Sequence, residues 1–535
     1  MSSSPSTDFS FEAQELSSLL LNASSSSSDI LNSCRVVESF IDRHSWDQTR
    51  HFYITCFPVL LRKIFGFEEV LQPSGIGGWI AQTSEHSANA VVNLLSPSGA
   101  LFSSIFAADE ENVVRYVFPS ECLPAWIRHM LQSERGLYIL SEVCPALFKD
   151  RLKENGHGGG FQVQLNAFEY FMFWFAYYAV CKDNDIMHRS DSDEMKLGFK
   201  KASRSRFEKW ASSLHSLHGS HDNGRPVKFN SSPYLHLLNL YLHKFVPISD
   251  FCAPSVSVHH FFEENPSIFS RAEFVVHTFV QFWLVNDDFS PLPSRVCQSF
   301  GILLPVNNRY HRYGLPSVEI TEAVKILVNY VSSTLCCPQE ELNSGWRAAS
   351  QMDTLRLRSF SLPRSSLVVP ATWSLLLQRP LYRFILRAFS YWPVGACLKK
   401  ATHIIDLWLD YLQPWNIGEE GEMMPALEED HYLEAENKML RDRDQRLSPL
   451  SGSLLQKQKT GTDSVGSLVK RSTKESCYGY NDHWQNYVLA NYPFYSSLVV
   501  QFLVFAHKFV HINTKAVLQM THKVHCSFLY SIMSY

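Results

Sequence analysis

Residues 379–415 constrain the fold more than any other stretch, because they predict two amphipathic helices joined at a corner. The apolar side chains recur at helical spacing on either side of that corner: Tyr382, Ile385, Leu386 and Phe389 before it, and Ile404, Ile405, Trp408, Leu409 and Leu412 after it. Pro393 separates the two runs, and proline cannot continue a helix but suits the first turn of the next one. Both stripes must be buried against neighbouring helices, so we expect Trp392, Trp408 and Trp415 in a helical core.

The composition is that of a large globular chain with an aromatic core. Its 535 residues allow two to four domains of ordinary size, and 13% of them are aromatic. The formal net charge is -4, and no basic stripe is present, so we expect no nucleic-acid partner. The 12 cysteines are scattered without a C-x-x-C pair, which indicates reduced thiols rather than a disulfide framework or a zinc site.

The helical pattern is interrupted in residues 79–118. Three short runs there, residues 90–95, 100–106 and 113–118, are rich in β-branched and aromatic side chains and are separated by turn-forming segments. These runs predict a small antiparallel meander near the N-terminus. The expected fold class is therefore mainly α, a multi-layer, solenoid-like array of helices with this meander and long disordered loops.

One helix start is strongly marked in the sequence. Asn166 and Glu169 have the spacing of a capping box, and Leu165 and Tyr170 can form the hydrophobic staple around it. The run that follows, residues 170–180, is apolar on all sides, which is typical of a buried helix. Glu169 is thus an acid among aromatic side chains, where burial raises a carboxyl pKa and suits it to general acid catalysis. Helix capping explains the same residue without catalysis, and both interpretations stay open.

A second group of candidate residues shares one face of the helix that ends before Pro414. Lys399, His403, Asp406 and Asp410 follow one another at intervals of three or four residues. A histidine with two carboxylates can bind a divalent metal ion or carry out acid–base chemistry. A solvated helix face opposite an apolar stripe has the same pattern, so the spacing alone does not decide between them.

The glycine-rich segment at residues 156–160 matches a binding motif incompletely. Backbone N–H groups in such a loop can cradle a phosphate ahead of a helix. The Gly-Lys-Ser/Thr ending of a nucleotide-binding loop is absent, and a simple connector between two elements has the same composition.

Three motifs stand out in the sequence: LNAFEY at residues 165–170, FSYWP at 389–393 and WLDYLQPW at 408–415. They resemble the signatures of the sphingomyelin phosphodiesterase 4 family, also called the neutral sphingomyelinase 3 family, and the last motif is the most specific. The resemblance covers most of the chain and ends near Val524, which leaves residues 525–535 as a divergent tail.

The resemblance implies a function in sphingolipid metabolism. Family members are expected to hydrolyse sphingomyelin or a related phosphosphingolipid to ceramide and a phosphorylated headgroup, with the help of Mg²⁺, at endoplasmic reticulum or nuclear envelope membranes. The alternative is a non-catalytic helical scaffold on these membranes, with partners among nuclear pore or endoplasmic reticulum proteins. The resemblance does not identify catalytic residues, so Glu169, His403, Asp406 and Asp410 remain the candidates.

The chain divides into regions of different character. We expect a disordered Ser-rich tail at residues 1–33, a helical domain at 34–417, a disordered charged and Ser-rich insertion at 418–480 and further helices of the domain at 481–524. Family members end in a membrane-spanning segment, whereas no apolar run here reaches the roughly 18 residues that a spanning helix needs. We therefore expect a short isoform or truncated form that is cytosolic or peripherally attached to membranes.

Overall fold

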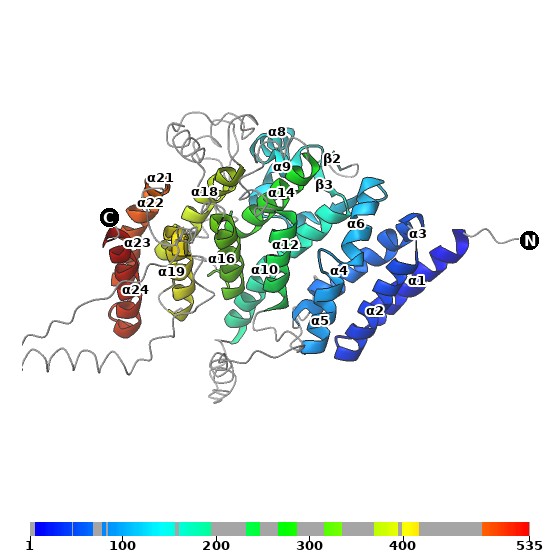
Figure 1. Cartoon of the computed structure of the whole chain (residues 1–535), viewed down its shortest axis with the longest axis horizontal. Helices are drawn as coiled ribbons and strands as arrows, with labels where there is room; N and C mark the ends of the chain where they lie inside the picture. The colour runs from blue at the N-terminus through cyan, green and yellow to red at the C-terminus, as the bar shows by residue number, and fades with distance from the viewer. Residues whose placement is uncertain are drawn as a thin grey trace, which may run out of the picture.

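The computed structural model describes the residues of the helical array and of one small sheet. These are residues 6–44, 46–67, 78–81, 84–155, 160–193, 232–246, 266–285, 315–333, 369–393, 398–416 and 484–533. The expected insertion at 418–480 lies outside the described residues. Helices that follow one another in the sequence lie side by side, from α1 and α2 at one end of the molecule to α23 and α24 at the other (Figure 1). The predicted fold class, mainly α with a small antiparallel sheet, is confirmed.

The N-terminal half contains short helices and the sheet. The helical elements before the sheet are α1 (Ser6–Asn22), α2 (Ser27–Arg43), α3 (Trp46–His51), the π-helix η1 (Phe52–Cys56), α4 (Phe57–Phe65), η2 (Trp79–Ala81), α5 (Glu85–Leu94) and α6 (Ala100–Glu110). The sheet region comprises β1 (Tyr116–Phe118), η3 (Ser120–Cys122), α7 (Ala125–Met130), α8 (Glu134–Val143), α9 (Pro145–Phe148), β2 (Leu152–Glu154) and β3 (Phe161–Leu165).

The rest of the chain is helical wherever it is described. The central layers are α10 (Ala167–Asp193), α12 (Pro233–Phe245), α14 (Pro266–Phe279) with the π-helix η6 (Val280–Leu284), and α16 (Val318–Ser333). The last layers are α18 (Val369–Tyr391), α19 (Lys399–Leu412), η9 (Pro414–Asn416), α21 (Gln485–Ala490), α22 (Tyr492–Tyr495), α23 (Ser497–Phe509) and α24 (Thr514–Met533). None of these described helices combines the length and the apolarity that crossing a bilayer requires.

The predicted disordered tail at residues 1–33 is wrong from Ser6 onward, because α1 and the start of α2 occupy it. Ala13, Leu16 and Leu20 lie on one face of α1 and are buried, and this helix packs on η1 and α4. The serines that suggested disorder serve the helices instead: the Ser26 side chain accepts a hydrogen bond from the backbone N–H of Asp29 at the start of α2. At the other end of the chain, α24 continues through the expected divergent tail as far as Met533.

The predicted three-stranded meander at residues 79–118 is wrong in two of its three strands. Two of its three runs form the helices α5 and α6, whose buried side chains recur with helical spacing, as at Leu101, Phe102 and Ile105. Of the three predicted runs, only the last contains a strand, β1; it pairs with β3 later in the chain, and β3 pairs in turn with β2. Local β propensity was overridden because these apolar residues bury better on a helix face in this context.

The sheet is antiparallel and has the order β1-β3-β2. Val117 of β1 faces Gln164 of β3, and Lys153 of β2 faces Gln162 of β3. Residues 156–159 lie outside the described part, and of the residues that flank them, the Asn155 N–H donates to the Gly160 carbonyl at 2.8 Å. The glycine-rich segment therefore connects two antiparallel strands, and β3 separates it from the helix α10.

The predicted corner is present, and its tryptophans are buried. Trp392, Trp408 and Trp415 expose 1%, 0% and 5% of their surface. The indole N–H of Trp408 donates to the Phe494 carbonyl at 3.2 Å, and its ring centroid lies 5.5 Å from that of Phe389. α18 packs on α23, and α19 packs on α16 and α24, so the corner joins three layers of the array.

Replacing Trp408 tests whether this corner holds the C-terminal layers together. We expect Trp408→Ala to lower the free energy of unfolding by about 3–5 kcal/mol, because it leaves a large cavity and an unpaired carbonyl. Tyr391→Ala is the control, since Tyr391 lies beside the corner and is 41% exposed. Urea unfolding followed by circular dichroism measures both, and an unchanged midpoint for Trp408→Ala would contradict the central role of the corner.

Candidate functional site

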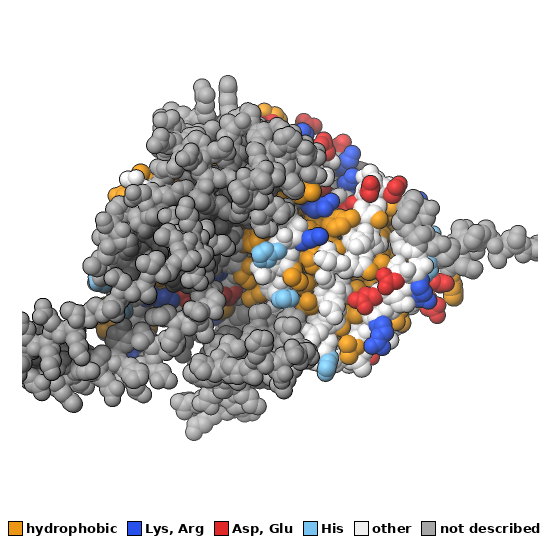
Figure 2. Space-filling model, in the orientation of Figure 1, with side chains coloured by type: hydrophobic (Ala, Val, Ile, Leu, Met, Phe, Trp, Pro, Cys, Tyr) orange, Lys and Arg blue, Asp and Glu red, His pale blue; other side chains and the backbone are white. Residues whose placement is uncertain are grey.

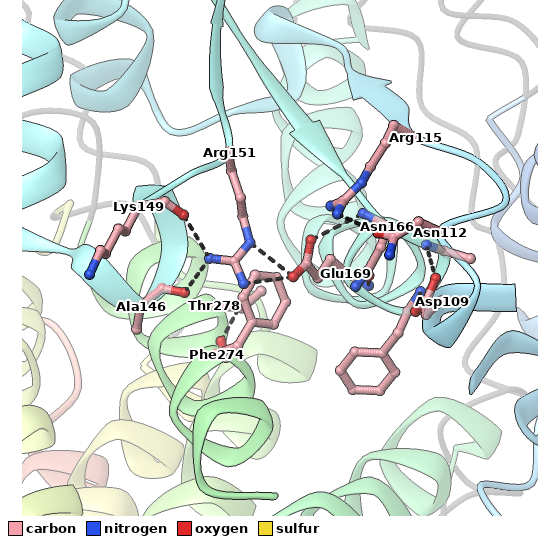
Figure 3. A network of polar contacts seen from close by, with 12 residues as sticks. Asp109, Asn112, Arg115, Ala146, Lys149, Arg151, Asn166, Glu169, Phe274 and Thr278 are labelled. Carbon is pink, nitrogen blue, oxygen red and sulfur yellow. Dashed lines mark hydrogen bonds and ion pairs between the residues drawn. The ribbon is translucent and has the colours of Figure 1, made fainter. Parts of the chain in front are cut away.

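Glu169 lies in a buried network of charged groups at the start of α10 (Figure 3). The Glu169 backbone N–H donates to Asn166 Oδ1 at 2.8 Å, and the Asn166 N–H donates to Glu169 Oε2 at 3.1 Å. The predicted capping box is therefore confirmed. The helix begins here because the box satisfies N–H groups that have no acceptor within the first turn.

Arg151, which directly precedes β2, balances the buried charge of Glu169. Its Nε and Nη2 atoms both donate to Glu169 Oε1, at 2.9 and 2.6 Å. Its Nη1 atom donates to the carbonyls of Ala146 at 3.0 Å and Lys149 at 3.4 Å, and the guanidinium lies 5.0 Å from the ring centroid of Phe274. Both carboxylate oxygens of Glu169 thus have hydrogen-bond donors, and Arg151 ties the strand region to α10 and α14.

A second carboxylate, Asp109 at the end of α6, completes the start of α10. Its Oδ1 accepts the Ala167 N–H at 2.8 Å and its Oδ2 accepts the Phe168 N–H at 3.0 Å. Burial raises the pKa of Asp109 to about 6, although these two hydrogen bonds act in the opposite direction. The sequence pattern did not single out Asp109, because it lies in an acidic segment that resembles an exposed turn.

Arg271 of α14 lies close to the same network. Its guanidinium is stacked 4.2 Å from the ring centroid of Phe106 and 5.6 Å from that of Phe168. Burial lowers the pKa of Arg271, and the charge of Asp109 opposes this effect. The start of α10 is therefore held by two acids and two arginines that come from α6, the β2 region, α10 and α14.

The other candidates, on α19, do not converge on one site. His403 Nδ1 lies 2.8 Å from Glu322 Oε1 of α16, and Asp406 pairs with Lys523 of α24. Asp410 Oδ2 lies 3.2 Å from Lys325 Nζ, again of α16. Each side chain thus points to a partner on another helix, and these contacts form a polar seam between α19 and its two neighbours.

The side chains of the seam are partly buried, and their surroundings shift the pKa values of Asp410 and Lys325. Burial raises the pKa of Asp410, while the ammonium of Lys325 and the Asn329 side chain at 3.4 Å favour its charged form. Burial also opposes the charge of Lys325, but the carboxylates around it, led by Asp410, outweigh burial and raise its pKa. The arrangement is that of interhelical ion pairs, each of which stabilises a fold by about 0–1 kcal/mol when partly solvated.

The described residues at these positions do not form a metal centre. No group of three or more His, Cys, Asp or Glu side chains comes close enough to hold a metal ion within the described ranges. The depression between Leu412, Gln413, Tyr495, Ser527 and Phe528 is open to solvent and leaves no room for a bound molecule. Pockets for small molecules usually have about 300–1,000 Å³.

Comparison with known proteins identifies relatives of this chain. A family model described as mitochondrial-associated sphingomyelin phosphodiesterase matches residues 12–198. Sphingomyelin phosphodiesterase 4 of Xenopus laevis is 23% identical over 500 residues, which cover 87% of this chain and 51% of the relative. The proteins of the same name from Mus musculus and Homo sapiens are both 22% identical, over 68% of this chain and 44% and 42% of their own lengths.

The chain is similar to the sphingomyelin phosphodiesterase 4 proteins at 22–23% identity. The resemblance seen in its motifs is confirmed. The chain spans about half the length of these relatives. No solved structure matches it.

The region matched by the sphingomyelin phosphodiesterase model contains most of the charged network. Residues 12–198 run from α1 into the region after α10, so they include Asp109, Arg151 and Glu169. Arg271 and the seam on α19 lie outside the match. The LNAFEY motif at residues 165–170 is therefore the end of β3 followed by the capping box of α10, and the family resemblance at this place has a structural explanation.

The pKa of Asp109 gives a test of its burial. An unfolded aspartate titrates near pH 4, whereas the folded Asp109 titrates at about 6. Between these values the folded chain binds a proton that the unfolded chain releases, so the stability supplied by this proton is full below about pH 4 and is lost as the pH rises through about 6. We expect the stability advantage of the wild type over Asp109→Asn to fall by on the order of 2 kcal/mol across this range.

Urea unfolding at a series of pH values measures this difference. Glu110→Gln is the control, because Glu110 is the neighbouring residue and is exposed; its curve should run parallel to the wild type. A difference between wild type and Asp109→Asn that rises with pH would show that the two backbone N–H donors dominate over burial.

Proposed function

We propose that the protein hydrolyses sphingomyelin or a related phosphosphingolipid to ceramide and a phosphorylated headgroup. The observation that carries this proposal is the similarity to sphingomyelin phosphodiesterase 4 proteins over 87% of the chain for the Xenopus laevis relative. The family model matched at residues 12–198 has a description of the same activity. Because the relatives are about twice as long, their activity is carried over here as a proposal.

The reaction requires a base that activates water, an acid for the leaving oxygen and cationic groups for the phosphoryl oxygens. Glu169, His403, Asp406 and Asp410 remain candidates for the proton transfers. Each of them is already paired with a side chain of another element, through Arg151, Glu322, Lys523 and Lys325 respectively. We therefore expect these four residues to stabilise helix packing rather than to contact the substrate.

The Mg²⁺ implied by the family resemblance does not fit the candidates that are described. Both oxygens of Glu169 accept hydrogen bonds from Arg151 and Asn166, and both oxygens of Asp109 accept backbone N–H groups. The α19 acids are separated by their own lysine partners. No step of the proposed reaction is therefore assigned to a metal ion bound at these residues.

Hydrolysis by the purified full chain tests the proposal directly. We expect release of phosphocholine from headgroup-labelled sphingomyelin dispersed in detergent, since detergent removes the need for membrane attachment. Parallel reactions with added Mg²⁺ and with a chelator show whether a metal ion is needed. Heat-denatured protein is the control, and equal release from active and denatured samples would contradict an enzymatic function.

A pair of variants separates a chemical role of Glu169 from a structural one. Glu169→Gln removes the carboxylate charge, whereas Arg151→Met breaks the same ion pair and leaves the carboxylate in place. We expect both variants to lose about 3–5 kcal/mol of stability, because each leaves a buried charge or polar group without its partner. We also expect both to keep the wild-type hydrolysis rate per folded molecule. A much lower rate for Glu169→Gln than for equally folded Arg151→Met would assign Glu169 to the chemistry.

A second candidate function is that of a non-catalytic helical scaffold, and the polar seam of α19 favours it. His403, Asp406 and Asp410 join α19 to α16 and α24, as expected for residues that hold an extended array together. Such a scaffold is proposed to act at endoplasmic reticulum or nuclear envelope membranes, with nuclear pore or endoplasmic reticulum proteins as partners. Proximity labelling from the full chain in cells distinguishes these sites from mitochondria, which the description of the matched family names.

A further inference from the structure

Exposed hydrophobic side chains are concentrated in the last layer of the array, which consists of α21, α22, α23 and α24. Of the large hydrophobic residues exposed in the described part of the chain, more than half lie within residues 489–518. They are Leu489, Tyr492, Val500, Leu503, Val504, Ile512 and Leu518. Such a concentration differs from the scattered single apolar residues found on ordinary protein surfaces, and it is typical of an interaction surface.

Three of these residues form the outer face of α23. Val500, Leu503 and Val504 have the i, i+3, i+4 spacing of one helix face and expose 57%, 53% and 60% of their surface. The opposite face of α23 is buried, with Phe502 and Phe505 in contact with the ring of Phe389 on α18. α23 and α24 form the end of the array farthest from α1 (Figure 1). The helix is therefore apolar on the side that packs and also on the side that faces outward.

The charge of this layer has one sign. Residues 484–535 contain no aspartate or glutamate, although the whole chain has a net charge of -4. Their basic side chains are Lys508, Lys515, Lys523, His507, His511, His522 and His525. Elsewhere the signs are mixed: acidic and basic side chains alternate over the N-terminal helices on the face that Figure 2 shows.

The basic groups lie next to the apolar stripe. His507 is exposed and continues the face of Leu503 by one turn, and His511 is exposed in the turn that follows α23. Lys508 Nζ donates to the Trp392 carbonyl at 3.0 Å, and this acceptor is neutral. Lys523, in contrast, is paired with Asp406. The stripe is thus bordered by positive charge from one lysine and from histidines when they are protonated.

We propose that the outer face of α23, with the adjoining exposed residues of α24, is a docking surface for an anionic lipid bilayer. Aliphatic side chains on one helix face enter the boundary between headgroups and acyl chains, and basic groups such as Lys508 attract anionic lipid headgroups. An anionic bilayer would repel carboxylates, and residues 484–535 contain no aspartate or glutamate. The proposal deepens the proposed function, because it names the surface by which a protein acting on membrane lipids attaches, but its test does not depend on hydrolysis.

Vesicle sedimentation with the full chain tests the surface. The vesicles contain phosphatidylcholine and phosphatidylserine and no sphingolipid, so hydrolysis does not affect the result. We expect Leu503→Asp/Val504→Asp to weaken binding by at least about tenfold, since two exposed aliphatic groups lose their burial and two negative charges are added. The matched control is Leu21→Asp, because Leu21 on α1 is similarly exposed, at 56%, and lies at the other end of the array.

The control should bind like the wild type, and vesicles of phosphatidylcholine alone should bind the wild type several-fold more weakly. Far-ultraviolet circular dichroism and thermal unfolding verify that the variants are folded. If Leu503→Asp/Val504→Asp does not fold, Leu503→Ser/Val504→Ser, which adds no charge, takes its place. Equal binding of wild type and double variant, or no binding of the wild type, would overturn the proposal. So would a wild-type dimer that the double variant converts to a monomer without a change in vesicle binding, because the occupant would then be a second copy of the chain.

Discussion

Helix α10 begins inside the protein, and the arrangement of the N-terminal half depends on this fact. The first N–H groups of a helix have no acceptor within the helix, and water cannot supply one in a buried site. Asp109 and Asn166 supply acceptors from outside the helix, and Glu169 Oε2 accepts a hydrogen bond from the Asn166 N–H. The charge of Glu169 in turn requires Arg151. One buried helix start therefore fixes the positions of α6, the β2 region and α14 around α10.

The interior next to this network is aromatic, and this explains why α10 is buried at all. Phe171, Phe175 and Tyr178 are almost fully covered, and their rings contact Phe65 on α4. Tyr234 on α12 stacks on Phe175 with ring centroids 4.5 Å apart. A helix that is apolar on all sides needs neighbours on all sides. The array supplies them from helices that precede α10 in the chain, such as α4, and from helices that follow it, such as α12.

The layers at the C-terminal end follow a different pattern. α16 and α19 are joined by a partly solvated polar seam, and α18, α19 and α23 share an aromatic centre around Trp408 and Phe502. The last helices bury one face in this centre and leave apolar and basic side chains on the other. The array thus has a closed aromatic interior and an end surface of distinct chemistry.

The sequence by itself determined the features that depend on neighbouring residues. The capping box of Asn166 and Glu169 and the burial of Trp392 and Trp408 could be predicted, because the residues involved lie within one or two helical turns of each other or on one repeating stripe. Motifs of that kind also carry the resemblance to the sphingomyelin phosphodiesterase 4 proteins. The serines before residue 33 suggested disorder, and the apolar runs of α5 and α6 suggested strands. Both interpretations failed, because burial against distant helices outweighed the local preference.

Only the tertiary structure decided what the candidate residues contact. Asp109 reaches the start of α10 across nearly 60 residues, and His403 meets Glu322 across 81. Hydrogen bonds and ion pairs depend on distances of about 3 Å between atoms, and spacing along one helix does not specify which side chain of another helix will come that close. The sequence could therefore show that His403, Asp406 and Asp410 share a face, but the packing of α16 and α24 determined that this face joins helices.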